Sequence, residues 1–203
     1  MKQISLIFFL LISIIFSSAI ARNDNNINLK IGGIALFDDL HDHLTTKQIR
    51  EKIKGNENYY IHLKKPFQFP TVSVKNHTLI NKKYKNVDIN YENKKGKFVV
   101  HSISAGEFYT DINLCFQDLR TLVENITFKY SNLKKEGPFG FPHPVDPSGK
   151  SKIIQYIFIG KNSEIEISCY DWSDEITNKK GYSDNLAFGI KSIQFSNWML
   201  DVK

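Results

Sequence analysis

The chain has two cysteines, and the patterns around them constrain the fold more than any other feature. Cys115 follows Asp111 in a segment where apolar residues recur every three or four positions, which predicts an amphipathic helix with Cys115 facing the core. Cys169 lies in residues 164–170, where apolar and polar residues alternate, which predicts a strand with Cys169 on its inward face. A disulfide between them would fasten the helix to the sheet. The alternative is a pair of buried free thiols.

The rest of the chain predicts an α+β fold: a largely antiparallel sheet with one long amphipathic helix packed on it and short helices near the N- and C-terminal ends. A capping-box pattern at Thr45 to Gln48 predicts a short helix that ends at Gly55. Phe195, Trp198 and Met199 mark a short closing helix. The segments expected to be strands are residues 29–37, 59–63, 71–74, 87–91, 98–103, 153–159, 164–170 and 185–190, and the glycine- and proline-rich residues 137–150 are expected to form a loop.

The first 21 residues have the three parts of a secretory signal peptide. Lys2 supplies the positive start, residues 4–16 are an apolar run, and Ala19 and Ala21 are small residues at the cleavage positions. Residues 22–203 would then form a single extracytoplasmic domain, periplasmic or secreted. The alternative is an uncleaved membrane anchor, but the apolar run has 13 residues where a spanning helix needs about 20. No other run is long enough, so we expect no stable membrane span after cleavage.

The chain carries 27 basic and 21 acidic residues, which raises the question of a nucleic-acid partner. Only Arg22, Arg50 and Arg120 are arginines, so the guanidinium groups that recognise bases and phosphates are almost lacking. We therefore expect no nucleic-acid binding. The lysine clusters fall in expected turns and are interpreted as solvated charge, with a polyanion patch as the alternative.

The stretch FPHPVDPSGKS, residues 141–151, ends like a phosphate-binding loop. Such a loop needs a glycine five positions before Gly149, but Pro144 stands there and has no N–H to donate. The stretch also precedes an expected strand instead of opening a helix. We therefore predict no nucleotide and no other cofactor, and interpret residues 146–149 as a β-turn.

Two further clusters suggest chemistry without completing a site. His41 and His43 are a candidate metal pair, because on an extended strand their imidazoles would share a face; the alternative is an ordinary polar approach to a helix. Ser104 lies in a sequence like a nucleophile elbow, but no helix follows at once, so the end of a strand is the favoured interpretation. No complete catalytic set is present, and no catalytic residue is predicted.

A possible ligand-binding site is expected around two segments near Cys169. Trp172 beside a carboxylate could form a stacking platform for a sugar or another ligand, although the end of a core strand is the alternative. The candidate residues are His143, Asp146, Ser148, Lys150, Asp171 and Trp172.

The segments HPVDPSGKS, SCYDWSDEI and SDNLAFGIKSIQF, in this order, resemble a group of small exported proteins from AT-rich marine bacteria. The resemblance is clearest from His143 to Trp198 and extends more weakly back to Ile31. It implies a bacterial origin and export, and it implies no functional residue.

These observations favour a non-catalytic exported domain that binds an envelope protein or a small ligand. The alternative is a small envelope hydrolase or metal-dependent enzyme. That alternative requires residues 38–43 to meet residues 143–150 in space.

Overall fold

A computed structural model describes residues 27–53, 60–75, 84 and 86–202. The predicted signal peptide and its cleavage site lie outside these residues. None of the described helices is long and apolar enough to cross a bilayer. The elements, in chain order, are β1 (Lys30–Ile31), β2 (Ile34–Ala35), η1 (Leu40–Asp42), α1 (Thr46–Ile53), β3 (Thr71–Lys75), β4 (Asn86–Lys94), β5 (Lys97–Phe108), α2 (Ile112–Lys129), β6 (Lys134–Pro142), β7 (Lys152–Ile159), β8 (Ser163–Asp171), α3 (Asp174–Lys180), β9 (Asn185–Ser192) and α4 (Ile193–Met199).

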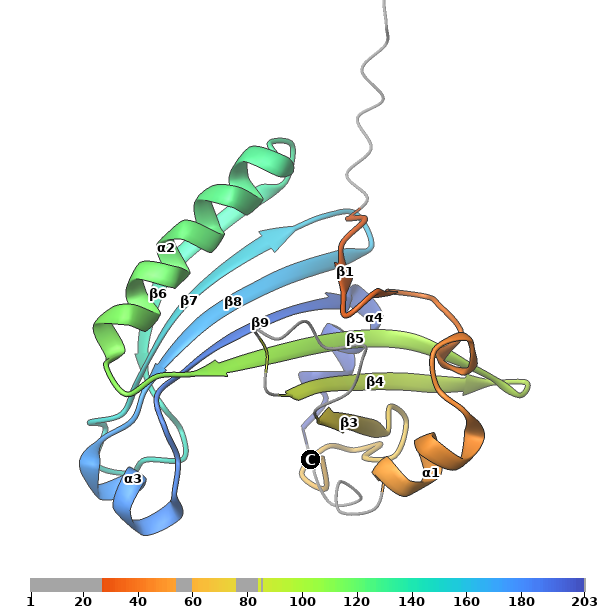
Figure 1. Ribbon diagram of the computed structural model, residues 1–203, viewed down its shortest axis with the longest axis horizontal. Helices are drawn as coiled ribbons and strands as arrows, with labels where there is room; N and C mark the ends of the chain where they lie inside the picture. Colours follow the sequence, from red (N-terminus) through yellow and green to blue (C-terminus); the bar gives the residue numbers. More distant parts are fainter. Residues whose placement is uncertain (1–26, 54–59, 76–83, 85, 203) are drawn as a thin grey trace, which may run out of the picture.

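The fold is α+β, with a mostly antiparallel sheet as predicted. Seven strands form the main sheet in the order β3-β4-β5-β9-β8-β7-β6, and each neighbouring pair is antiparallel. In Figure 1, α2 lies in front of this sheet and α4 lies behind it. α2 packs against β8 and β9, whereas α4 packs against β9 and β5. The two helices therefore cover different faces.

The main core lies between α2 and the sheet. Cys115, Leu119, Val123 and Ile126 are buried on one side of α2. They face a layer of buried side chains on the two strands beneath, namely Ile165, Ile167 and Cys169 of β8 and Leu186, Phe188 and Ile190 of β9. Burial of this apolar surface is the main force that holds helix and sheet together.

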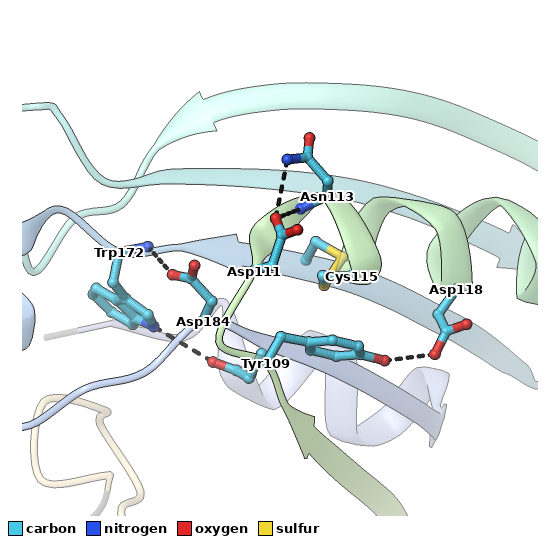
Figure 2. The surroundings of a disulfide bond; sticks show 9 residues. Tyr109, Asp111, Asn113, Cys115, Asp118, Trp172 and Asp184 are labelled. Atoms are coloured by element: carbon cyan, nitrogen blue, oxygen red, sulfur yellow. Dashed lines mark hydrogen bonds between the residues drawn. A yellow bond between two sulfur atoms is a disulfide. The ribbon is translucent and has the colours of Figure 1, made fainter.

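The predicted disulfide between Cys115 and Cys169 is present, with the two Cα atoms 6.1 Å apart and both side chains fully buried. Figure 2 shows its surroundings at the start of α2. Asp111 caps the helix, because its carboxylate accepts a hydrogen bond from the backbone N–H of Asn113 at 2.9 Å. The hydroxyl of Tyr109 donates to Asp118 at 2.7 Å. The disulfide therefore fastens the start of α2 to β8, and hydrogen bonds from the residues that lead into the helix and cap it fix the same end.

Several local predictions are confirmed. α1 begins with the predicted capping box: the backbone N–H of Thr45 donates to Oε1 of Gln48 at 2.8 Å, and the N–H of Gln48 donates to Oγ1 of Thr45 at 3.3 Å. The two hairpins are present as β4–β5 and β7–β8. The turn of the first is tighter than predicted, because Lys95 and Gly96 both adopt positive φ, at 55° and 89°.

The single strand predicted over residues 29–37 is wrong. β1 and β2 form a separate two-stranded hairpin, with Ile31 opposite Ile34. Gly32 and Gly33 make its turn at φ 61° and 85°, a conformation that glycine adopts without steric cost.

The strand predicted over residues 59–63 is also wrong for its described part. Residues 60–62 form a turn, in which the N–H of Leu63 donates to the carbonyl of Tyr60 at 2.9 Å. Leu63 makes only an isolated bridge to Val202. Leu63 and Tyr60 instead join a second, smaller core with Phe69 and Trp198, whereas Ile61 is exposed.

The loop expected over residues 137–150 is wrong in its first part, where β6 forms the edge of the sheet. An edge strand tolerates a proline because one side of it needs no ladder hydrogen bonds. The register of β6 on β7 shifts between Glu136 and Phe139, around the cis peptide bond of Gly137 and Pro138. A Cβ at Gly137 would lie 2.6 Å from the carbonyl oxygen of Gln155, so only glycine fits there.

Candidate ligand-binding site

The face of the sheet opposite α2 carries the candidate site. Side chains alternate along β9, so Leu186, Phe188 and Ile190 point to the core, whereas Ala187 and Lys191 point to the other face. Over the middle of that face lies a hollow of about 520 Å³, a size in the range of small-molecule sites.

Small residues at the centre of the sheet account for the hollow. In one row across the strands, Gly106 of β5 pairs with Ala187 of β9. In the next row, Ser104 of β5 pairs with Gly189 of β9. These residues have small side chains or none, so they leave open the space that larger side chains would fill. They form the floor of the hollow.

One end of the hollow is polar. Ser102 of β5 lies opposite Lys191 of β9, which lies opposite Glu164 of β8. Nζ of Lys191 is 2.6 Å from Oε2 of Glu166 and 3.2 Å from Oε1 of Glu164. Burial lowers the pKa of Lys191, but the two carboxylates more than offset it, so the pKa lies above its usual value. Lys191 is therefore charged and already paired with two carboxylates.

The other end of the hollow is aromatic. There Phe108 of β5 and Tyr170 of β8 both pair with Asn185 of β9. Trp172 follows β8, and its ring centroid lies 4.2 Å from that of His143. The indole N–H of Trp172 donates to Oδ1 of Asn185 at 3.4 Å. Figure 2 shows Trp172 held also through its backbone N–H, which donates to Asp184 at 2.8 Å.

His143 is neutral at pH 7. Burial lowers its pKa, and the nearby Asp146 carboxylate opposes this only in part. Nδ1 of His143 accepts a hydrogen bond from the backbone N–H of Val145 at 3.1 Å, so in the neutral ring the proton is on Nε2. That assignment leaves His143 with one donor at the aromatic end of the hollow.

The charge of the lining differs from that of the chain. Among the described residues that line the hollow, Lys191 is the one basic residue, and Asp88 and Glu166 are the acidic ones. Their formal sum is −1, whereas the whole chain carries +6. The hollow therefore offers no attraction to an anionic ligand.

The predicted ligand residues divide between the hollow and its surroundings. His143 and Trp172 line the hollow. Asp171 follows Tyr170 along β8, so its side chain points to the opposite face, where burial and the nearby Asp184 raise its pKa and Lys152 opposes the rise.

Asp146 and Ser148 contact each other instead of the hollow. The Asp146 carboxylate accepts hydrogen bonds from the N–H and the hydroxyl of Ser148 at 2.9 and 2.6 Å. It also accepts from the N–H and hydroxyl of Ser151 at 2.8 and 2.6 Å and from the hydroxyl of Ser173, the N-cap of α3, at 3.0 Å. Hydrogen bonds from Ser148 and Ser151 hold the Asp146 pKa well below its ordinary value. Asp146 thus ties its loop to α3, and Lys150 is exposed on the same loop.

The β-turn predicted over residues 146–149 is confirmed, since the N–H of Gly149 donates to the carbonyl of Asp146 at 3.0 Å. Ser104 is not at the end of a strand, as was expected, but well inside β5. A nucleophile elbow requires a sharp turn from strand to helix, and Ser104 has none.

His41 and His43 each bind a neighbouring carboxylate. Nδ1 of His41 is 3.2 Å from Asp39, and Nε2 of His43 is 2.9 Å from Asp38. The described residues contain no group of three or more histidine, cysteine, aspartate or glutamate side chains that could hold a metal ion.

The two clusters that the enzyme alternative requires to meet lie at opposite ends of β5. Asp39 forms a bridge with Val99, near the start of β5. The aromatic end of the hollow, with His143, adjoins Phe108, the last residue of the same strand. The premise of a shared site for these two clusters is therefore not met.

A buried serine, histidine and glutamate form an arrangement that resembles a catalytic triad. Nδ1 of His101 is 2.9 Å from Oγ of Ser192, and Nε2 of His101 is 3.5 Å from Glu92. His101 and Ser192 are each 1% exposed, and Oγ of Ser192 accepts from the N–H of Phe195 as the cap of α4. Because no substrate can reach this serine, we interpret the cluster as structural.

Sequence reasoning missed most of the residues that line the hollow. The alternation in residues 185–191 already places a small or polar residue at every second position of an otherwise apolar strand. That pattern indicates a strand with one open face, but the partners of each residue depend on the strand order.

No known protein family, curated protein or solved structure matches this chain.

Proposed function

We propose that the protein is a non-catalytic exported domain of the bacterial envelope that holds a small ligand in the hollow on the open face of its sheet. The observation that carries this proposal is the pair of rows at the centre of the sheet, Gly106 with Ala187 and Ser104 with Gly189, which leave the hollow between a polar and an aromatic end. Sites of this kind combine an apolar wall with a few polar groups that orient the ligand.

Export is supported by the signal-like residues 1–21 and by the disulfide, since disulfides persist in oxidising compartments. We take α2 as the amphipathic helix predicted around Cys115. The disulfide fastens α2 to β8, so α2 covers one face of the sheet. The other face remains open to a ligand.

The absence of catalysis is supported by how the candidate groups are used. Lys191 is paired with Glu164 and Glu166, and the serine bonded to His101 is buried. Among the described residues that line the hollow, no serine is hydrogen-bonded to a histidine or a carboxylate that could act as its base.

The proposal is tested by filling the hollow. Ala187→Leu places a larger side chain on its floor, and Thr121→Leu places the same side chain on the exposed side of α2 as a matched control. The three proteins, each starting at Arg22, are incubated with small molecules extracted from bacterial envelopes, washed and analysed by mass spectrometry. We expect the wild type and Thr121→Leu to retain the same compound and Ala187→Leu to lose it. Equal retention by Ala187→Leu, or no retention by any protein, would contradict the proposal.

A further inference from the structure

We propose that the ligand of the hollow is an uncharged carbohydrate, bound with a sugar ring against the aromatic end and its hydroxyl groups toward the polar floor. This inference rests on the proposed function and names the ligand class of the same site.

The aromatic end provides a surface for the apolar side of a sugar. A pyranose ring has a face of C–H groups and a rim of hydroxyl groups. Tyr170 and Trp172 are nearly parallel, with an interplanar angle of 13° and ring centroids 6.3 Å apart. The ring centroids of His143 and Tyr182 lie 4.2 and 4.7 Å from that of Trp172. These contacts hold the Trp172 ring in place before any ligand binds. Rigid aromatic groups of this kind supply contact area at little cost in conformational entropy.

The floor provides partners for the hydroxyl rim. Ser102 and Ser104 lie on the open face of β5, and neither hydroxyl has a hydrogen-bond partner within the described part of the chain. A serine hydroxyl both donates and accepts, as does a sugar hydroxyl, so the two are complementary. Nδ2 of Asn86, on the neighbouring strand, is only 3.5 Å from Asp88, which leaves its donors weakly used.

The two ends are too far apart for one sugar ring to occupy both. Phe108 at the aromatic end and Ser102 at the polar end are six residues apart on β5, which corresponds to about 20 Å along a strand. We therefore expect an oligosaccharide to bind more tightly than the matching monosaccharide.

Other ligand classes fit less well. An anionic ligand would meet Asp88 and Glu166, while the positive charge of Lys191 is already neutralised. A lipid chain would cover Ser102, Ser104 and Asn86 without offering them a hydrogen bond, which costs free energy for each polar group left unpaired.

The test follows the indole N–H signals in NMR spectra of the ¹⁵N-labelled protein from Arg22 onward. The chain has two tryptophans, and Trp172→Phe identifies the signal of Trp172 by its loss. Trp198 gives the second signal, which should shift less than that of Trp172, because Trp198 does not line the hollow, is 5% exposed and donates its indole N–H to the carbonyl of Lys65 at 2.8 Å. The probes are maltotriose, N-acetylated chitotriose and mannotriose, with trigalacturonic acid as the anionic control and lauric acid as the lipid control, each at millimolar concentration.

We expect at least one neutral trisaccharide to shift the Trp172 signal and to bind more tightly than its monosaccharide. Ser104→Ala should weaken this binding about two- to tenfold, the usual effect of one lost hydrogen bond. The matched control Ser131→Ala, on the exposed turn after α2, should leave it unchanged.

The outcomes separate this inference from the proposed function. If the trigalacturonic acid or the lauric acid shifts the Trp172 signal and no neutral sugar does, the carbohydrate assignment is wrong while the hollow remains a binding site. If no neutral sugar shifts the signal and Ala187→Leu still loses an extracted compound, the assignment is again wrong and the proposed function stands. If no probe shifts it and no compound is retained, both are wrong.

Discussion

Removing the disulfide tests how the fold is held together. The bridge closes a loop of 54 residues, and the loss of unfolded-chain entropy for a loop of this length corresponds to about 4 kcal/mol at 25 °C. Both sulfur atoms are fully buried, so Cys115→Ala/Cys169→Ala also removes some core packing. We expect the double variant to be less stable than the oxidised wild type by at least about 4 kcal/mol.

The assay is urea unfolding of the chain from Arg22, followed by tryptophan fluorescence and circular dichroism. For a domain of this size, a slope of about 2 kcal/mol per M makes the expected loss a fall of about 2 M in the unfolding midpoint. The wild type in reductant, which keeps both sulfur atoms, should unfold near the double variant. If both midpoints stay within about 0.5 M of the oxidised wild type, the cross-link does not stabilise the fold by this amount.

Two further changes test the sheet and the loop beside it. A Cβ at Gly189 would lie 3.1 Å from the backbone carbonyl of Ile103 and 3.2 Å from Cβ of Ser104. Gly189→Ala should therefore cost about 1–3 kcal/mol in urea unfolding, whereas Gly106→Ala, whose Cβ would lie 3.5 Å or more from its neighbours, should cost little or nothing; equal effects would refute this account of the floor. Hydrogen bonds from serine side chains lower the Asp146 pKa, so its contribution to stability is complete above the ordinary carboxyl pKa of about 4 and is lost as the pH falls further. Asp146→Asn should be less stable at pH 7 and less sensitive to acid below pH 4 than the wild type, and an unchanged acid dependence would contradict the assigned role.

The features predicted correctly from the sequence depend on residues close together in the chain. The capping box of α1 spans Thr45 to Gln48, and the β4–β5 hairpin follows from a turn signal only a few residues long, although the turn itself is tighter than predicted. The pairing of Cys115 with Cys169 joins distant segments, but it could be predicted because the local pattern around each cysteine places it on the buried side of its own element.

The features predicted wrongly depend on contacts between distant segments. Residues 60–63 have the composition of a strand, but Tyr60 and Leu63 pack with α4 near the end of the chain. For residues 137–142 of β6 the sequence predicts a loop, because Pro138 and its neighbouring glycines disfavour strands, and only their position at the edge of the sheet makes them acceptable.

The hollow itself could not be predicted because it depends on the order of the strands. Gly106 and Ala187 are far apart in the chain and form one floor only because β5 and β9 are neighbours. Lys191 lies beside Glu166 for the same reason, since β9 also pairs with β8. A sequence pattern indicates the open face of each strand but not which open faces adjoin.

The central claim is that a ligand occupies the open face of the sheet, and backbone amide shifts in NMR measure this most directly. The labelled protein is titrated with the compound that the wild type retains. We expect the largest shifts in β5, β8 and β9, around Ser104, Tyr170 and Ala187, with little change along α2. Shifts centred on α2 or on residues 143–151, with none on the open face, would contradict it.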